Sequence, residues 1–412
     1  MARNLAVSDI PQDWTYQLLD NVAERCSGHT PSKSFPEYWN GGIKWVSLTD
    51  SFNLDKGYIY ETSKEISEQG IANSSAELHP AETVFLCRDA GIGKSGVMAE
   101  PMAVSQHFIA WKCDNTKQLH SWFLYNWLRY YKKEFERQAV GSTIKTIGLP
   151  YFRKLKIALP HYEEQKKIAQ ILATWDKAIT TTEQLLANSQ QQKKGLMQQL
   201  LTGKKRLLNE NGQRFKGEWS KGRLGDLLSI SKGKQRNKDT LTESGEFPVI
   251  NGGVTPSGYT DESNTEANTI TISEGGNSCG FVSYQSSPFW CGGHCYAIEK
   301  LTLNLNFIYQ LLKFNESKIM RLRVGSGLPN IQKKELERFT LCFPKSELEQ
   351  QSLATVFSIA DNEVAILENR LKLLKIEKKA LMQQLLTGKR RVKLMEDIAC
   401  LLYTSPSPRD RG

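Results

Sequence analysis

Leu196-Met-Gln-Gln-Leu-Leu-Thr-Gly203 occurs twice in this chain: the same eight residues return as Leu381-Met-Gln-Gln-Leu-Leu-Thr-Gly388. Each copy is followed by three basic residues, Lys204-Lys205-Arg206 and Lys389-Arg390-Arg391. The same offset pairs identical residues upstream, namely Gln165 with Gln350, Ala169 with Ala354 and Asp176 with Asp361. An identity of this length indicates an internal duplication.

The duplication extends through the part that precedes each of these stretches. With a slip of one residue it pairs Pro160 with Pro344, Ile147 with Ile331 and Gly141-Ser142 with Gly325-Ser326. The match extends more faintly, and at a different offset, into the segments before, where Trp14 and Leu19 resemble Trp219 and Leu224. The chain therefore consists of two copies of one unit. Its 412 residues also exceed what one hydrophobic core usually organises, which predicts at least two domains.

The second part of each copy is predicted to be a long helix. Its apolar residues alternate steps of four and three, the spacing of a coiled-coil seam. The first seam is Ile168, Leu172, Trp175, Ile179, Leu186, Leu196 and Leu200, interrupted by Thr182, Ser189 and Lys193. The second seam is Leu353, Phe357, Ala360, Val364, Leu367, Leu371, Leu374, Leu381 and Leu385, interrupted only by Lys378.

Both helices are expected to end at Thr-Gly, because glycine suits the left-handed residue that closes a helix and cations suit its negative end. Two matched seams favour pairing of the helices with each other; the alternative is that each helix packs on its own domain. The polar positions of the first seam either fix the register of the pair or mark a loosened middle. About 39 residues at ~1.5 Å each span about 58 Å, so we expect a spacer.

The first part of each copy is predicted to be an α/β globule. Short β-like runs are bounded by clusters of Gly, Asn, Ser and Pro, at residues 43–46, 83–86, 247–250 and 269–272. A helical stretch follows in each copy, at 119–137 and 305–323. The expected fold class is α+β, with two tandem globules each followed by a long helix.

The composition limits the kind of partner and the compartment. The chain has 54 Lys and Arg against 44 Asp and Glu, a net charge of +10, which favours polyanions because bound phosphates release counterions. Its eight cysteines are scattered without a dense framework, so reduced thiols are expected. We find no stretch apolar enough to span a membrane and no signal-like beginning, which predicts a cytoplasmic protein without a membrane partner.

Two glycine-rich motifs match parts of enzyme signatures. Gly91-Ile-Gly-Lys94-Ser95 matches the end of a phosphate-binding loop, but Arg88 stands where the first glycine belongs. Gly276-Asn-Ser278-Cys-Gly280 matches a nucleophile elbow, but a β-like run follows where the elbow needs a helix. A shared structural turn explains both motifs better than nucleotide or ester hydrolysis, and it would present Arg88 and Lys94 to a phosphate backbone.

Three other patterns have an ordinary structural explanation beside a functional one. Cys291-Gly-Gly-His294-Cys295 offers soft ligands, but a closed zinc site needs four, so structural cysteines are favoured. Aromatic and basic residues interleave over 122–133, where burial in a core is favoured over a nucleic-acid surface. Lys232-Gly-Lys234-Gln-Arg236-Asn-Lys238 predicts an exposed loop, for which phosphate contact and plain solvation are equally supported.

Four features together point to a family. They are the duplication, the entry Pro160-x-x-Glu-Glu-Gln165-Lys-Lys-Ile168-Ala169-x-Ile171-Leu172, the two Leu-Met-Gln-Gln-Leu-Leu-Thr-Gly-Lys exits, and Ile66-Ser-Glu-x-Gly70 followed by Asn73-Ser74-Ser75-Ala76. Over about residues 10–393 the chain resembles the specificity subunit of type I restriction-modification systems.

The resemblance implies two target recognition domains, each recognising half of a split, double-stranded DNA target. It also implies that the two helices pair antiparallel, set the gap between the halves and dock two modification subunits. This chain is then a non-catalytic subunit that binds no cofactor or metal. The modification subunits are expected to methylate adenine with S-adenosylmethionine, and separate motor/nuclease restriction subunits to use ATP and magnesium.

The expected boundaries follow from these assignments. They are 1–160 for the first recognition domain, 161–206 for the central helical spacer, 207–344 for the second recognition domain, 345–393 for the distal helical spacer and 394–412 for an irregular tail. Within that tail, 400–410 is interpreted as translated sequencing adaptor, because it shares neither the periodicity nor the composition of the rest.

Two sets of site residues are predicted. DNA contact is expected from Arg88, Lys94, Lys232, Lys234, Arg236, Lys238, Arg321 and Arg323. The spacer and its partner-binding surface are expected from Ile168, Leu172, Trp175, Ile179, Leu353, Phe357, Val364, Leu367, Leu371 and Leu374. Two other functions stay open. One is an orphan copy that serves as a recombination reservoir. The other is a coiled-coil interaction protein with lectin-like globules and no DNA role, for which duplex binding would depend little on salt.

Overall fold

The computed structural model describes residues 10–113, 117–325 and 327–393. They form two compact units, one made of residues up to 181 together with those from 371 onward, the other of residues 182–370. The boundary falls inside both long helices, α5 (Tyr162–Leu200) and α10 (Glu347–Leu385). The expected tail at 394–412 lies outside the described residues.

The first unit contains three sheets, with the strand orders β2-β9-β6-β7-β4, β5-β3-β8 and β1-β10. The strands are β1 Thr15–Leu18, β2 Glu24–Ser27, β3 Trp39–Val46, β4 Tyr58–Ile59, β5 Glu65–Ile66, β6 Val84–Cys87, β7 Ser95–Met98, β8 Ala103–Val104, β9 Phe108–Lys112 and β10 Lys156–Leu159. The helices before α5 are α1 Glu68–Ala72, α2 Ser121–Tyr130, α3 Lys132–Gln138 and α4 Leu149–Arg153, with 3-10 turns at Leu19–Asn21, Pro36–Tyr38 and Leu48–Phe52.

The second unit also contains three sheets, with the orders β12-β18-β15-β16, β14-β13-β17 and β11-β19. The strands are β11 Trp219–Arg223, β12 Ser229–Lys232, β13 Phe247–Ile250, β14 Tyr259–Thr260, β15 Thr269–Ser273, β16 Val282–Gln285, β17 Trp290–Cys291, β18 Cys295–Glu299 and β19 Thr340–Pro344. The helices are α6 Leu224–Leu227, α7 Leu305–Phe314, α8 Glu316–Met320 and α9 Lys333–Arg338, with a 3-10 turn at Lys238–Thr240.

The two units share one topology, which confirms the duplication. The antiparallel order β2-β9-β6-β7 matches β12-β18-β15-β16. In both small sheets the central strand, β3 or β13, has one antiparallel and one parallel neighbour. The faint match of Leu19 with Leu224 also holds, since their N–H groups donate to the equivalent carbonyls of Leu155 and Phe339.

The four predicted β runs lie within or overlap β3, β6, β13 and β15. The two helical stretches are each broken into two helices, which differs from the continuous stretches expected. The breaks fall at Tyr131 and Asn315, where backbone ψ opens to 11° and 5°. The aromatic residues of the first stretch are core, as favoured: Phe123, Tyr125, Trp127 and Phe135 are buried in one cluster.

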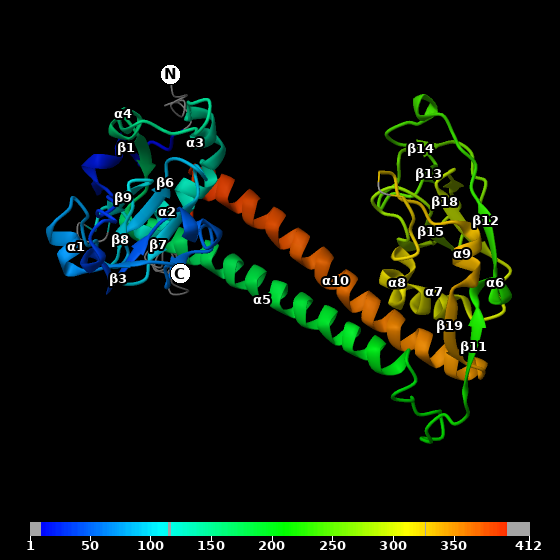
Figure 1. Cartoon of the computed structure of the whole chain (residues 1–412). Helices are drawn as coiled ribbons and strands as arrows, with labels where there is room; N and C mark the ends of the chain where they lie inside the picture. Colours follow the sequence, from blue (N-terminus) through cyan, green and yellow to red (C-terminus); the bar gives the residue numbers. More distant parts are fainter. Residues whose placement is uncertain (1–9, 114–116, 326, 394–412) are drawn as a thin grey trace, which may run out of the picture. The chain divides into compact units, whose positions relative to one another are not determined.

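The long helices lie side by side and run in opposite directions (Figure 1). In the first unit the Trp175 indole donates to Glu377 at 3.3 Å, and Lys378 bonds Asp176. In the second unit the Ser189 hydroxyl donates to Glu363 at 3.0 Å, and Lys193 bonds Asp361. Numbers rise along one helix as they fall along the other, so the predicted antiparallel pairing is confirmed.

The polar seam positions fix the register of this pair. Lys193 and Lys378 are equivalent in the duplication, and so are Asp176 and Asp361, so one ion pair between the helices is made twice. A slip of either helix would leave the half-buried charges without partners, which is costly. One seam assignment was wrong: Leu196 is exposed, and Met197 is buried in its place.

The ends of both helices also belong to the cores of the units. Ile168 and Leu172 are buried in the first core beside Leu385, and Leu353 and Phe357 in the second. Packing of each helix on its own domain, the alternative to pairing, therefore applies at the helix ends. Because these four predicted partner-binding side chains are buried, they offer no surface to another subunit.

Glycine closes both helices in the same way. Gly203 and Gly388 adopt φ angles of 70° and 72°, the left-handed region that glycine favours. A Cβ atom on Gly388 would lie 2.4 Å from Cγ of Pro11, so a larger residue does not fit.

None of the helices in the described part of the chain combines the length and the apolar character that a membrane span requires.

Candidate nucleic-acid interface

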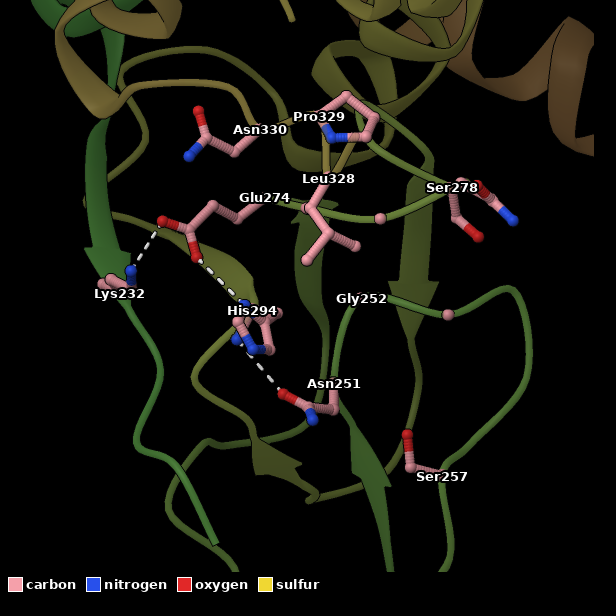
Figure 2. A pocket seen from close by; sticks show the side chains of 14 residues that line it. Lys232, Asn251, Gly252, Ser257, Glu274, Ser278, His294, Leu328, Pro329 and Asn330 are labelled. Carbon is pink, nitrogen blue, oxygen red and sulfur yellow. Dashed lines mark hydrogen bonds and ion pairs between the residues drawn. The ribbon is translucent and has the colours of Figure 1, made fainter. Parts of the chain in front are cut away.

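A polar cleft of about 570 Å³ lies in the second unit (Figure 2). It is formed by the end of β12, the loops after β13 and β15, the turn before β18 and the loop before α9. Its polar side chains include Lys232, Asn251, Glu274, His294 and Asn330. The cleft is also lined by glycines at 252, 253, 275 and 276. Because glycine has no side chain, the backbone groups at these positions are exposed to the cleft.

Glu274 is the electrostatic centre of this cleft. Its carboxylate accepts from the Lys232 ammonium at 2.6 Å and from the Tyr296 hydroxyl at 3.3 Å, and the His294 Nδ1 atom lies 3.8 Å away. Burial beside this carboxylate raises the pKa of Tyr296, so its hydroxyl remains a donor. The cleft thus presents one acceptor group flanked by donors, an arrangement suited to the edges of bases.

Backbone hydrogen bonds join the loops of the cleft into a frame. The Glu274 N–H donates to the His294 carbonyl at 2.9 Å, and the Ile331 N–H donates to the Glu274 carbonyl at 2.8 Å. The Gly276 N–H donates to the Pro329 carbonyl at 3.0 Å. The side chains of the cleft are therefore held on a fixed backbone.

The first unit builds the same frame. The Arg88 N–H donates to the His107 carbonyl at 2.9 Å, and the Ile147 N–H donates to the Arg88 carbonyl at 2.8 Å. Arg88 therefore corresponds to Glu274, and His107 to His294. The His107 Nδ1 atom lies 2.8 Å from the Asp89 carboxylate, so each unit pairs this histidine with a carboxylate from the same turn.

The two glycine-rich motifs form equivalent turns in the two units, which agrees with the structural explanation favoured from the sequence. The Gly93 N–H donates to the Cys87 carbonyl at 3.0 Å, and the Gly280 N–H donates to the Ser273 carbonyl at 2.8 Å. Each turn leads into a strand, β7 or β16, whereas a phosphate-binding loop and a nucleophile elbow both lead into a helix.

The predicted DNA-contact residues of the second unit lie in and around the cleft. Lys232 lines it. Lys234 and Lys238 are exposed on the loop that follows β12, and Arg236 stacks on the Trp290 ring at 4.5 Å while bonding Glu262 at 3.1 Å. Arg321 and Arg323 are exposed just after α8, and residues 328–330 further along the chain form one wall of the cleft.

The two predicted residues of the first unit are less accessible. Arg88 is half-buried in the frame, and its Nε atom has no hydrogen-bond partner among the described residues. Lys94 is also half-buried, and its ammonium donates to the Ser51 carbonyl at 3.0 Å. Both lie at the turn predicted for them, but Lys94 must leave this carbonyl before it can contact a phosphate.

Sequence reasoning missed the matched histidines and the polar residues Thr146 and Asn330 beside them. The pattern Cys291-Gly-Gly-His294-Cys295 was interpreted as structural cysteines, which left His294 without a role. Both cysteines are buried, as structural cysteines are, and the Cys291 thiol together with burial raises the pKa of Cys295. Within the described residues, the one group of three potential metal ligands does not include them. A repeat alignment that allowed the offset to change by three further residues, from 184 to 187, would have paired His107 with His294.

The family model described as "Type I restriction modification DNA specificity domain" matches residues 11–188 and 216–376 of this chain. The chain belongs to this family. It is 24% identical over 431 residues to the type I restriction enzyme MjaIX specificity subunit of Methanocaldococcus jannaschii, covering 94% of this chain and 95% of the relative. It is 34% identical over 164 residues to a putative type I specificity subunit of Mycoplasma genitalium, covering 39% and 42%.

Solved structures share the fold of this specificity subunit. The crystal structure of the type I restriction-modification S subunit from M. genitalium superposes with a TM-score of 0.66 at 18% identity, covering 95% of this chain and 99% of that one. The match of the family model over most of the chain confirms the family resemblance. As a specificity subunit, the chain recognises the DNA target within a type I complex and is not a catalytic subunit. The interaction protein without a DNA role is ruled out.

Proposed function

We propose that this specificity subunit recognises a two-part, asymmetric DNA target, one half with each unit, while the paired helices set the gap. The observation that supports this proposal is one backbone frame that carries different side chains in the two units. The differing pairs are Arg88 and Glu274, Asp89 and Gly275, and Thr146 and Asn330. One duplicated recognition fold can then bind two different half-sites from a single chain.

The chemistry at these positions favours different bases. An arginine offers only donors and suits the two acceptors of guanine, whereas a glutamate offers only acceptors and suits the cytosine amino group. Asn330 can both donate and accept, which suits adenine. Arg88 in one unit and Glu274 in the other therefore give opposite hydrogen-bonding patterns at one place in the frame. The target halves are expected to differ for this reason.

The exposed cations around the cleft are proposed to bind phosphates. Lys234, Lys238, Arg321 and Arg323 are exposed, and phosphate contacts position a protein on DNA without sequence information. Each such contact adds to the salt dependence of binding. Residues 1–160 and 207–344 are then the recognition domains, and 161–206 and 345–393 are the spacers that contain α5 and α10.

The outer face of α10 is proposed to dock a modification subunit. In the second unit, Leu348, Ile359 and Ile366 are 67%, 63% and 65% exposed, which is unusual for large apolar side chains that recur along one face. The equivalent residues of α5 are Glu163, Thr174 and Thr181. Two modification subunits, expected from the duplication, would therefore meet chemically different outer faces.

The chemistry of the complex is proposed to reside in those partners. The modification subunits would use S-adenosylmethionine to methylate adenine, and the motor/nuclease subunits would use ATP and magnesium. Mapping methylated adenines in DNA from cells that hold this chain and its modification subunits tests the proposal. It predicts one motif with two different halves and a constant gap. A single continuous motif would contradict it.

A further inference from the structure

Three potential metal ligands meet in the first unit, away from the frame that carries Arg88 and His107. Cys26 lies on β2, and Glu77 and His79 lie in the extended segment that precedes β6. One ligand atom from each side chain lies within 4.8 Å of the others. Glu77 and His79 are two positions apart in extended chain, so their side chains point the same way.

His79 supplies an independent reason to expect a ligand. It is fully buried, with 0% of its surface exposed, and neither ring nitrogen has a hydrogen-bond partner among the described residues. A buried polar group without a partner has lost the hydrogen bonds that water gives it in the unfolded chain. Such groups are therefore rare in folded proteins.

The surroundings of Cys26 suit a bound cation. The thiol is buried, and it lies 3.8 Å from the Glu24 carbonyl and 3.9 Å from the Glu24 carboxylate. A dication displaces the proton and is held by the resulting thiolate. Lys112 lies beside the site but is bonded to Glu24 at 2.9 Å.

We propose that Cys26, Glu77 and His79 bind one divalent transition-metal ion, and that zinc is the ion this donor set favours. Thiolate, imidazole and carboxylate are the three ligand types that zinc takes in proteins. One thiolate and one carboxylate neutralise its charge, while Lys112 and Glu24 neutralise each other. The fourth position is left to water.

Small movements close the site. Zinc–ligand bonds of about 2.0 to 2.3 Å require the three atoms to lie closer together than 4.8 Å. Glu77 is exposed and can change rotamer. Cys26 is held by strand pairing opposite Ala110, and His79 by two backbone hydrogen bonds with Met102, of 2.8 and 3.0 Å. Glu77 is therefore the ligand that moves.

The second unit has other residues at the positions of two of these ligands. By strand register, Ser231 stands where the first unit has Cys26, and Thr265 stands where it has His79. The site thus belongs to the first unit alone. A bound ion would join the edge strand β2 to the segment that enters β6, and so stabilise the first unit and not the second.

The test uses the reduced, chelator-treated full chain titrated with cobalt(II) and with zinc. Cobalt is expected to bind at one equivalent with a thiolate charge-transfer band, and zinc to displace it and raise the melting temperature. Cys26→Ser and His79→Thr copy the second unit, so these side chains suit the fold. Each is expected to remove the band or weaken zinc binding by at least about 10-fold, since even outer-shell changes cost that much.

The matched control is Cys342→Ser, which removes an exposed thiol in the second unit and should leave cobalt and zinc binding unchanged. Circular dichroism establishes that each variant is folded. Absence of the charge-transfer band in the unmodified chain would overturn the proposal. So would an unchanged band in Cys26→Ser, or a band that Cys342→Ser abolishes.

Discussion

Arg391 binds the carboxylate of Glu164 through two hydrogen bonds of 2.7 and 2.6 Å, and this contact has a twin in the second unit. There Arg206 binds Glu349 through two hydrogen bonds of 2.5 Å. The two glutamate side chains are only 4% and 1% exposed. Each arginine is the last of the three basic residues after a Thr-Gly helix end, and each glutamate begins the other helix. The start of one helix is thus fastened to the end of its partner.

Removing Arg391 should destabilise the first unit. Arg391→Ala leaves the Glu164 carboxylate buried without its partner, which should lower the free energy of unfolding by about 3 kcal/mol. Hydrogen exchange should rise in β1 and at the start of α5, whereas Arg206→Ala should act on β11 and the start of α10. Adding Glu164→Gln to Arg391→Ala should recover part of the loss. A change below about 0.5 kcal/mol would contradict this account.

Lys378 should make stability depend on pH. Burial lowers its pKa to about 8 and Arg129 adds repulsion, although Asp176 opposes both. Below pH 8 both states hold the proton, and the full penalty of burying the charge is present. Between pH 8 and 10.5 only the unfolded state keeps it, so stability rises with pH in this window, by about 3 kcal/mol.

Urea unfolding from pH 7.5 to 10.5 measures this effect as the difference between the unmodified chain and Lys378→Met. That difference should shift in favour of the unmodified chain as the pH rises. Lys379→Met changes an exposed neighbour and serves as the control, for which no such shift is expected. A difference that is constant over the whole range would show that Lys378 is not buried as a charge.

Lengthening both helices should widen the gap in the DNA target. One heptad inserted after Thr181 in α5 and one after Arg370 in α10 keep the seam in phase and add about 10 Å, or about three base pairs. Methylation mapping should then show the same half-sites with a wider gap. A heptad in α5 alone should disrupt the ion pairs between the helices and lower methylation. Altered half-sites in the double insertion would contradict the spacer role.

Asn330 and Lys238 should affect DNA binding differently. Asn330→Ala should relax specificity at one base pair of one half-site, at a cost of about 1–3 kcal/mol, and Thr146→Ala should act on the other half. Lys238→Ala should weaken binding to all sequences and reduce the salt slope by about 1. Binding measured on single-base variants of the target over a salt series separates the two effects. Uniform weakening by Asn330→Ala would exclude a base contact.

The sequence predicted the duplicated parts of the fold well, because repeated side chains reveal them. The pairing of Asp176 with Asp361 at one offset revealed the duplication, although it did not show the ion pair that each aspartate makes, and the Thr-Gly sequences marked both helix ends. The breaks at Tyr131 and Asn315 were missed, because local apolar periodicity continues across them. Leu196 was assigned to the seam because a strict heptad count cannot show where the buried face of a helix changes from its partner helix to the core of a domain.

The sites were less predictable, because their parts are distant in the chain. Arg88, His107 and Ile147 meet only through backbone hydrogen bonds between loops. Cys26 and His79 are brought together by pairing across two sheets, and no local motif joins them. The basic stretch that contains Lys232 and Lys238 could be proposed for DNA contact because its spacing is visible in the sequence, and that role stays a prediction. Even there, only the fold shows that Lys232 bonds Glu274.

Exchange of the two recognition domains tests the central claim most directly. A chain in which residues 10–160 and 207–344 trade places, with α5 and α10 unchanged, is produced together with its modification subunits, and methylated adenines are mapped. We expect the two halves of the motif to swap order around a gap of unchanged length. A motif identical to that of the original chain would contradict the assignment of one half-site to each unit.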